Sequence, residues 1–378
     1  MDFRLTPEQE EFRRTVRDFA SRVIAPRADE LDASGHFPDD IVLEMGKLGL
    51  MGLPFPERYG GVGADFTTLC IAIEEIGRVD QSMGITLEAA VGLGAMPIYL
   101  FGSEEQKQRW LVPLARGEKI PGFGLTEPEA GSDSGATKTT ARLDDGSWVI
   151  DGTKVFITNV GTPISQHVTI TARTSKDEVS NIIVPVGTAG FDTGKKYRKL
   201  GWHASDTREL VFNGCRVPEE NLLGARGEGF KNFLIILDGG RVAIGALAVG
   251  CAQGCLDLCV SYAKDRKQFG RPIADNQAIA FKLADMAMKT DLARLAVYRA
   301  AWMHDNGMPF KTEASIAKLY STEVANDIVR EAVQIHGGYG FMDEFPVSRF
   351  YRDAKVLEIG EGTSEVQRIL IARAVLGA

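Results

Sequence analysis

The chain has 378 residues, which is enough for two or three domains that each bury a core. Its 43 Lys and Arg against 51 Asp and Glu leave a net charge of −8. This charge argues against a general binder of nucleic acid or of an anionic membrane, because both need a basic face. A hydrophobic fraction of 44% and a charged fraction of 25% are ordinary for a folded protein and exclude disorder as the main state.

The start of the chain has no targeting pattern and instead predicts a helix, with Thr6 as its N-cap, Pro7 in the first turn and Gln9 completing a capping box. There is no run of 18 apolar residues, so we expect no membrane-spanning helix. The five cysteines lack a secreted spacing, which favours a reducing compartment. We therefore expect a bacterial cytoplasmic protein that is folded from its first residues. A mitochondrial matrix protein whose transit peptide has been removed has the same pattern.

Residues 1–120 are predicted to form an all-helical domain, because Phe12, Val16, Phe19 and Val23 repeat at helical spacing. Residues 121–227 are predicted to form a β-barrel-like domain of short strands without βαβ spacing. Its β-branched runs are 147–150, 155–158, 167–171, 182–184 and 210–212. The dipeptides between such runs predict hairpins: Asp145-Gly146, Asp151-Gly152 and Asn213-Gly214.

Residues 228–378 are predicted to form a four-helix bundle. Its helices are expected at about 229–265, 275–305 and 312–336, with a last one from near Thr363. The third helix ends at Gly337-Gly338, a glycine-type stop. The fold class is therefore α+β with three domains in the order helical, β and helical.

Several common functional motifs are missing from the sequence. There is no G-x-G-x-x-G, no P-loop and no metal-ligating histidine spacing, so we expect no nicotinamide site and no metal. Three cysteines at i, i+4 and i+8 could hold a soft metal, but they are better explained as small core residues: Cys251, Cys255 and Cys259. Two S-x-x-K matches lie inside predicted helices without companion motifs and are attributed to chance: Ser261/Lys264 and Ser315/Lys318.

Three segments are candidates for a ligand site. Residues 123–133 mix hydroxyls, glycines and a proline, which suits either a loop that presents backbone donors to a polar planar ligand or a structural turn. Phe156 and Thr158 share one face of a strand and could stack on a ring and bond its edge, or belong to a half-buried strand. Glu361 precedes a helix that Thr363 or Ser364 would cap, and the N–H groups of such a helix end bind anions. A solvated loop glutamate is the alternative for Glu361.

Seven segments in this order resemble the acyl-CoA dehydrogenase family, and most closely its short- and medium-chain, butyryl-type members. The resemblance covers essentially the whole chain. The seven segments are residues 56–61, 125–133, 156–159, 205–208, 266–270, 334–338 and 361–363.

The resemblance implies FAD as cofactor, a homotetramer built as a dimer of dimers, and the three domains described above. It implies contacts to the flavin or to the pantetheine of the thioester from Phe123, Leu125, Thr126 and Ser132, and to the flavin from Phe156 and Thr158. It implies contacts to the FAD pyrophosphate and ribose from Thr363 and Glu365. It also implies contacts to the FAD of a neighbouring subunit from Arg266, Gln268, Phe269, Gln277, Gln334, Gly337 and Gly338.

The resemblance implies α,β-dehydrogenation of an acyl-CoA thioester to the trans-2-enoyl-CoA, with Glu361 as the base for the α-proton and FAD as the acceptor of the β-hydride. Electrons would pass to an electron-transfer flavoprotein. The substrate contacts implied are Ser132, Asp238, Arg241, Gly360 and Arg373. Some relatives carry the base just before the arginine, but here that position is Gly240.

Two departures from the family pattern leave the acyl group open. Gly360 replaces a common Tyr beside the base and removes bulk from the acyl pocket. His203, next to Trp202, replaces an Arg or a glycine-rich turn, and a structural role at the surface is favoured for it. Three other functions remain alternatives: an oxygen-using oxidase-like relative, a flavin monooxygenase-like relative, and a non-catalytic subunit of a hetero-oligomer.

Overall fold

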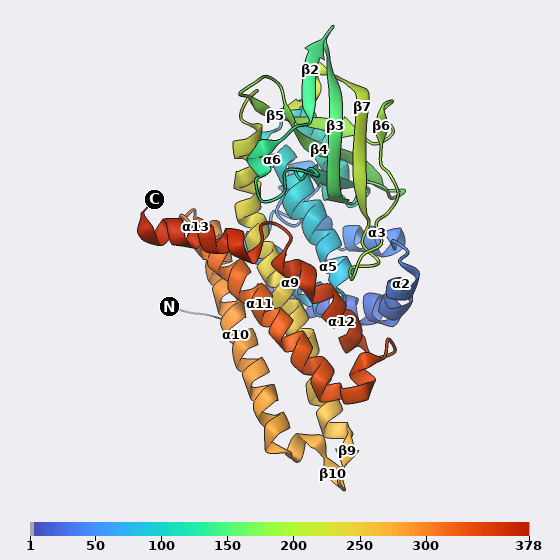
Figure 1. The fold of residues 1–378 in the computed structure, drawn as a ribbon, viewed down its shortest axis with the longest axis vertical. Helices are drawn as coiled ribbons and strands as arrows, with labels where there is room; N and C mark the ends of the chain where they lie inside the picture. The colour runs from blue at the N-terminus through green and yellow to red at the C-terminus, as the bar shows by residue number, and fades with distance from the viewer. Residues whose placement is uncertain (1–3, 378) are drawn as a thin grey trace.

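The computed structural model describes residues 4–377. The first three residues, where folded structure was expected to begin, lie outside this range, as does Ala378. Figure 1 shows a sheet at one end of an elongated molecule, and long helices that run from it to the other end. The N-terminal helices lie beside both parts.

The N-terminal part is helical, as predicted. Its helices are α1 (Pro7–Phe19), α2 (Ala28–Ser34), α3 (Asp39–Lys47), α4 (Phe66–Gly77), α5 (Gln81–Glu88), α6 (Met96–Phe101), α7 (Glu104–Gln106) and α8 (Val112–Ala115). The π-helical segment η5 (Ala89–Ala95) joins α5 to α6. The predicted capping box is confirmed, because Gln9 N donates to Thr6 Oγ1 at 3.2 Å and Thr6 N donates to Gln9 Oε1 at 3.1 Å.

The middle part is one eight-stranded sheet. Its strands are β1 (Ile120–Gly124), β2 (Thr140–Asp144), β3 (Ser147–Thr158), β4 (Ser165–Arg173), β5 (Val179–Pro185), β6 (Phe191–Asp192), β7 (Thr207–Pro218) and β8 (Leu222–Leu223). The order is β6-β7-β3-β2-β4-β5-β8, and β1 pairs with β4. Side chains from β2, β3, β4, β5 and β7 share one apolar core, so the sheet curls around it in a barrel-like way.

The hairpin predictions divide into one that is confirmed and two that are wrong. Asp145-Gly146 is the β2–β3 turn, and both residues have positive φ, at 48° and 67°. Asp151-Gly152 lies inside the continuous strand β3, and Asn213-Gly214 lies inside β7. The β3–β7 register shifts between Ile150 and Gly152, and Gly214 N donates to Asp151 Oδ1 at 2.7 Å. These two dipeptides therefore form an irregular, bulged stretch of a strand pair instead of turns.

The C-terminal helices are α9 (Gly229–Asp265), α10 (Gln277–Asp305), α11 (Lys311–His336), α12 (Pro346–Ala354) and α13 (Ser364–Leu376). The hairpin β9 (Lys267–Gln268)–β10 (Arg271–Pro272) joins α9 to α10. The helices α9, α10 and α11 pack on one another; α13 packs on α11, and α4 packs along α9 and α10. Cys251, Cys255 and Cys259 are fully buried on α9 within this apolar core.

Although no run of 18 apolar residues exists, two helical stretches are long and apolar enough, by length and composition, to cross a membrane: Gln81–Phe101 and Gly229–Asp265. In both, 72% of the most apolar window is buried inside the protein. Their hydropathy is therefore that of core helices, which are apolar all round because other elements surround them.

His203 belongs to a group of side chains, with Asp32 and Arg352, that joins three parts of the chain. Its Nδ1 lies 2.9 Å from Asp32 Oδ1 on α2, and its Nε2 lies 2.9 Å from the Lys199 carbonyl oxygen in the loop before β7. Arg352 on α12 donates to Asp32 Oδ2 at 2.6 Å. A half-buried histidine here thus helps to hold the N-terminal helices, the sheet and the C-terminal helices together.

Candidate functional site

Glu361 lies on a tight turn between the short 3-10 helix η11 (Lys355–Glu358) and α13. Its φ of 54° is in the left-handed region, which costs a non-glycine residue energy and is common at functional sites. Two side chains hold the turn. Lys318 Nζ donates to the Gly362 carbonyl at 2.8 Å, and Gln367 Nε2 donates to the same oxygen at 3.0 Å. The turn therefore aims the Glu361 side chain from a fixed backbone.

The side chain of Glu361 reaches α9 at Gly240. An added Cβ at residue 240 would overlap Glu361 Oε2 and would lie 3.0 Å from Leu93 Cδ2. The Oε2 atom is buried and has no hydrogen-bond partner among the described residues. Gly240 is thus the residue whose lack of a side chain makes room for the carboxyl. A carboxylate at residue 240 and one at residue 361 cannot both occupy this space.

A second carboxyl, which the sequence did not indicate, lies beside Glu361. Glu88 at the end of α5 is 0% exposed, and within residues 4–377 neither of its oxygens has a hydrogen-bond partner. Burial, and then the adjoining Glu361 carboxyl, raises the pKa of Glu88 well above its usual range. Burial also raises the pKa of Glu361, to about 7, which is the range of a general base that works near neutral pH.

Cationic side chains lie close to this pair of carboxyls but have other partners. Arg241 on α9 is buried and forms an ion pair with Asp238. Lys318 is 0% exposed on α11 and bonds the Gly362 carbonyl. Burial lowers the pKa of Lys318 to about 8, although Glu361 opposes this shift. Both cations lower the pKa of Glu361 through space without forming a hydrogen bond to its carboxyl.

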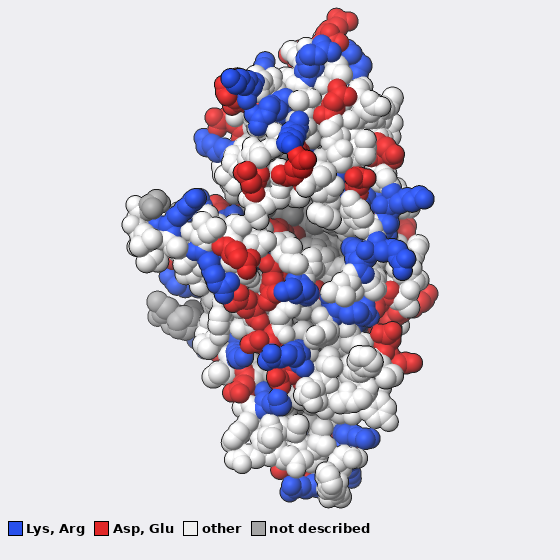
Figure 2. Space-filling view, in the orientation of Figure 1, with Lys and Arg blue, Asp and Glu red and all other residues white. Residues whose placement is uncertain are grey.

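An apolar cluster adjoins the carboxyls where the sheet meets the helices. Leu125, Phe233 and Leu237 are buried together, and Phe123 and Leu93 pack against them. The rings of Phe123 and Phe233 stack with centroids 3.9 Å apart. Figure 2 shows the molecule hollowed between the sheet and the helices, where Figure 1 draws α5, α9 and the start of α13 together. Apolar walls beside a buried carboxyl at a domain junction suit a ligand with a hydrocarbon part.

The loop that follows β1 is fixed to the sheet by a buried lysine. Lys154 on β3 is 0% exposed, and its Nζ donates to the Leu125 carbonyl at 3.1 Å and to Glu127 Oε1 at 2.7 Å. Glu127 also accepts from Thr139 N at 3.0 Å. The loop thus keeps Thr126 half-buried beside the sheet, while Ser132 is exposed further along it.

Phe156 and Thr158 lie near the end of β3. Phe156 has a φ of 63° and leaves 67% of its surface exposed, and Tyr197 is its aromatic neighbour at 5.7 Å. A strained and exposed aromatic residue in a rigid strand fits a planar ring system that would cover it. Thr158, two residues on, is half-buried. The flavin contacts of Phe156 and Thr158 stay a prediction.

A second set of the predicted residues lies at the other end of α9, away from Glu361. Arg266, Gln268, Gly337 and Gly338 line a surface pocket of about 600 Å³, and the Arg266 guanidinium is 5.4 Å from the centroid of the Tyr339 ring. Gln277, Gln334 and Phe269 are exposed on the adjoining elements. Glu361 packs against Gly240, and about 38 Å of helix separates Gly240 from the end of α9 at Asp265. A single chain therefore cannot bring these residues to its own Glu361.

The remaining predicted residues have these positions. Thr363 is the N-cap of α13, with its Oγ1 accepting from Val366 N at 3.3 Å, and Glu365 is exposed in the first turn. An added Cβ at Gly360 would meet only the Val356 carbonyl oxygen, at 3.6 Å, so there is open space beside Glu361. Arg373 is exposed three turns along α13, and the structure does not bring it to the carboxyls.

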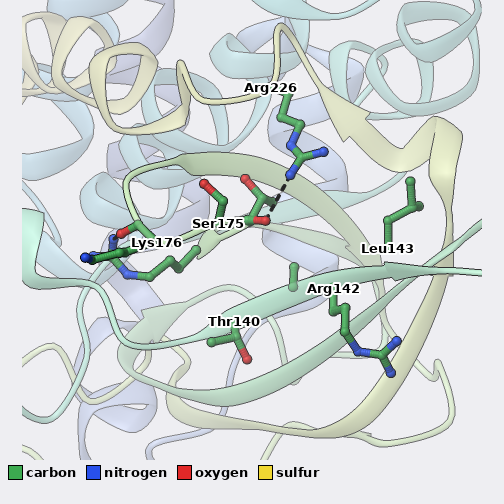
Figure 3. A pocket seen from close by; sticks show the side chains of 9 residues that line it. Thr140, Arg142, Leu143, Ser175, Lys176 and Arg226 are labelled. Atoms are coloured by element: carbon green, nitrogen blue, oxygen red, sulfur yellow. Dashed lines mark hydrogen bonds between the residues drawn. The ribbon is translucent and has the colours of Figure 1, made fainter.

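Another pocket, of about 510 Å³, lies on the sheet and is lined by four cationic side chains (Figure 3). Arg226 bonds the Thr174 carbonyl at 3.0 Å, and Arg173 bonds the Lys176 carbonyl at 2.7 Å. Arg142 and Lys176 lie on opposite sides of it (Figure 3). These cations are dispersed or already bonded, so the pocket has no convergent set of groups like that around Glu361.

Several residues of the site could not be singled out from the sequence. Glu88 is one acid in an apolar helix, and only its placement against Glu361 makes it informative. In the sequence Lys318 is part of an S-x-x-K match attributed to chance, whereas in the structure its side chain holds the Glu361 turn. The signal that could have identified it is its position on the apolar face of α11, one turn from Ala314 and Ser321.

The comparisons with known proteins cover all three parts of the chain. The family models described as acyl-CoA dehydrogenase N-terminal, middle and C-terminal domain match residues 6–118, 122–215 and 227–376. A relative described as a probable acyl-CoA dehydrogenase of Bacillus subtilis is 51% identical over 100% of both chains.

The fold also matches solved structures over its whole length. Butyryl-CoA dehydrogenase from Megasphaera elsdenii has a TM-score of 0.97 and 43% identity, with 100% of both chains covered. A chain from the work on the electron transferring flavoprotein of Acidaminococcus fermentans has a TM-score of 0.98, 43% identity and the same coverage. An acyl-CoA dehydrogenase complexed with FAD from Bacillus anthracis has a TM-score of 0.93 and 35% identity, covering 99% of this chain and 68% of that one.

Proposed function

The chain belongs to the acyl-CoA dehydrogenase family, and we propose that it oxidises an acyl-CoA thioester to the trans-2-enoyl-CoA with Glu361 as the catalytic base. The observation that carries this proposal is the Glu361 carboxyl, which a strained turn aims into a buried space beside an apolar cluster. The likeness to butyryl-CoA dehydrogenase supports a short acyl chain. The open space beside Gly360 would also accommodate a branch.

In this proposal the chain's own residues move one proton and polarise one carbonyl. The α-hydrogen of a thioester is a weak acid, so it needs a base whose pKa is raised and a hydrogen bond to the thioester oxygen. The pKa of Glu361, raised by burial to about 7, meets the first need. The backbone N–H of Glu361, on the same fixed turn, is the expected donor for the second. The apolar cluster around Phe233 would exclude water from the acyl chain.

We propose FAD as the cofactor, which the FAD complex of the related Bacillus anthracis enzyme supports. Bound FAD would supply the acceptor for the hydride that leaves the β-carbon. Phe156 and Thr158 would hold the flavin with the loop of Leu125 and Thr126. The N-terminus of α13, capped by Thr363, would face the pyrophosphate, because its free N–H groups favour an anion.

We propose that the chain works as a homotetramer, a dimer of dimers, in which Arg266, Gln268 and Phe269 of one subunit complete the FAD site of another. The separation of this set from Glu361 along α9 supports the proposal, as does Phe269, which is fully exposed. Exposed apolar side chains also follow one another along α10: Phe281, Met288, Leu292, Leu295 and Trp302. An unpaired apolar stripe of this kind is typical of a subunit interface.

The proposed electron acceptor is an electron-transfer flavoprotein, and the proposed location is the bacterial cytoplasm. The match to a chain studied with the electron transferring flavoprotein of Acidaminococcus fermentans supports the first, and the bacterial relatives support the second.

The test is anaerobic bleaching of the purified flavoprotein by a panel of acyl-CoAs, with Glu361→Gln alongside. We expect one class of thioester to bleach the flavin, and the variant to lose this reaction while it keeps its FAD. Unimpaired bleaching in Glu361→Gln would show that another residue is the base. No bleaching by any thioester would contradict the proposed reaction.

A further inference from the structure

The proposed reaction uses one carboxyl, but the structure contains two that face each other. Glu88 ends α5 where the helix continues into η5, and Glu361 reaches it from the turn before α13. Glu88 is 0% exposed. The carboxyl of Glu88 packs closely against Gly92, because an added Cβ at Gly92 would lie 3.1 Å from Glu88 Oε1. Glycines at residues 92 and 240 thus leave room for one carboxyl each.

The groups that surround the pair do not supply a cation to Glu88. From α9, Arg241 faces Glu361 but is ion-paired with Asp238. From α11, Lys318 faces Glu361 and Glu358, and its Nζ donates to the Gly362 carbonyl. The group that acts on Glu88 itself is the Glu361 carboxyl. Within the described residues both Glu88 oxygens and Glu361 Oε2 therefore lack a donor.

Two adjacent buried carboxylates without a donor between them repel each other, and this arrangement is costly. A single proton removes the repulsion and supplies the missing donor, because a neutral carboxylic acid can donate to a carboxylate. The negative charge belongs on Glu361, since Arg241 and Lys318 both favour its ionised form, whereas Glu88 has no such help.

We propose that Glu88 and Glu361 share one proton in the resting enzyme, with Glu88 as a neutral acid that donates a hydrogen bond to the Glu361 carboxylate. This inference rests on the proposed function, in which Glu361 is the base. Glu88 is then a positioning residue. It orients the carboxylate and helps to set the pH above which Glu361 is ionised. When Glu361 takes the α-proton, the pair holds two protons, and one leaves to solvent when the base is regenerated.

Two variants of Glu88 separate its hydrogen-bond donor from its ability to ionise. Glu88→Gln keeps the shape and an N–H donor but cannot ionise, whereas Glu88→Leu has neither donor nor charge. Activity requires ionised Glu361, so the rate of flavin reduction rises with pH through the pKa of the pair. In Glu88→Leu the carboxylate loses its donor, and this rise should move to higher pH by about one to two units, the effect of one charge-assisted hydrogen bond. In Glu88→Gln it should remain within a few tenths of a unit of the wild type.

A second readout does not depend on turnover. The infrared spectrum of the resting enzyme, at a pH where Glu361 is ionised, should contain the C=O band of a buried protonated carboxyl. That band should disappear in Glu88→Gln and persist in Glu361→Gln, where Glu88 is still buried. Because the band is measured without substrate, it tests the shared proton even if Glu361 is not the base, whereas bleaching of Glu361→Gln tests the base alone.

Glu75→Gln is the matched control. It removes a buried carboxyl on α4 that is paired with Arg17, outside the site, and should lower stability without moving the pH profile. A wild-type spectrum without the band would overturn the proposal, and so would an unshifted profile in Glu88→Leu. A Glu88→Leu enzyme that prefers different acyl-CoAs at an unchanged pH profile would show that Glu88 contacts the acyl group instead. If Glu88→Leu does not fold, the isosteric Glu88→Gln and the infrared band decide the question.

Discussion

The position of one glycine decides where the carboxyl of the proposed base can lie. Among residues 4–377, six non-glycine residues have positive φ, and three of these are candidate site residues: Phe156, Phe269 and Glu361. At Glu361 this backbone points the carboxyl at Gly240, where an added methyl group would overlap it. The strained backbone at residue 361 and the lack of a side chain at residue 240 therefore act together to place the Glu361 carboxyl.

Gly240→Ala should disable the base without unfolding the protein. The new methyl group would displace the Glu361 carboxyl, and a shift of about 1 Å in a reacting group can cost about 10²-fold in rate. We expect flavin reduction by acyl-CoA to slow by that order while FAD is retained, as measured by stopped-flow absorbance. Gly239→Ala is the control, because its added Cβ would meet only Phe66, at 3.9 Å. Equal rates in the two alanine variants would contradict this account of Gly240.

Single residues also show where prediction from the sequence ends. Thr6 and Gln9 form their capping box within four residues, so local sequence was enough to predict it. Glu88 and Glu361 are far apart in the sequence, and the apolar residues that flank Glu88 do not indicate which group its carboxyl meets. Its burial is a property of the tertiary fold, and a single sequence does not display that property.

For whole helices and strands, too, local patterns could be predicted from the sequence and tertiary pairing could not. The long helices α9, α10 and α11 have bounds within two residues of those predicted, because apolar spacing repeated over many turns is a strong signal. The dipeptides Asp151-Gly152 and Asn213-Gly214 predict turns, but each lies in the middle of a strand. The residue types that permit a tight turn also permit a bulge, and the pairing partner across the sheet decides between them.

The loop after β1 depends on one buried lysine, which gives an element-scale prediction. Lys154→Met removes the donor to the Leu125 carbonyl and leaves the buried Glu127 carboxylate without its cation, although the Thr139 N–H still donates to it. Breaking a buried ion pair from one side costs about 3–5 kcal/mol. We expect a drop of that size in the urea-derived free energy of unfolding, together with weaker FAD retention on a sizing column.

The double variant Lys154→Met with Glu127→Gln provides the comparison. Because it leaves no unpaired charge in the sheet, it should recover part of the lost stability. The loop would still lack its tie to β3, so FAD retention should stay low. A Lys154→Met protein with full stability and full FAD content would show that the ion pair does not fix this loop.

At the scale of the molecule, the N-terminal helices, the sheet and the C-terminal helices meet through contacts that no local sequence pattern predicts. Asp32, His203 and Arg352 come from three different parts of the chain and form one connected group. The domain order could be predicted, because helical and strand patterns change near residues 120 and 228. The surfaces through which the domains contact one another could not be predicted, since they depend on packing between elements that are distant in the sequence.

The proposed assembly makes a prediction about Phe269. This side chain is 101% exposed and has a φ of 52°, so its position gains nothing from contacts within the described chain. Phe269→Asp would bring a charge into the proposed subunit contact. We expect a smaller species by multi-angle light scattering and loss of FAD, with circular dichroism unchanged. Leu143→Asp, a half-exposed apolar position on the sheet, should leave the mass unchanged. A Phe269→Asp protein of unchanged mass and FAD content would contradict the contact.

The uninterrupted helix α9 carries Asp238 and Arg241 in its N-terminal half and leads directly into Arg266 at its C-terminal end. Each residue of an α-helix adds 1.5 Å of length and about 100° of rotation. Inserting one residue between Arg241 and Arg266 would rotate one end of the helix by about 100° relative to the other. Inserting about seven residues, which is two full turns, would nearly restore the facing directions of the two ends but at a greater separation. Evolution can therefore lengthen the surface loops of this protein gradually, but α9 can change its length only in whole turns, together with every subunit that it would meet in the proposed assembly.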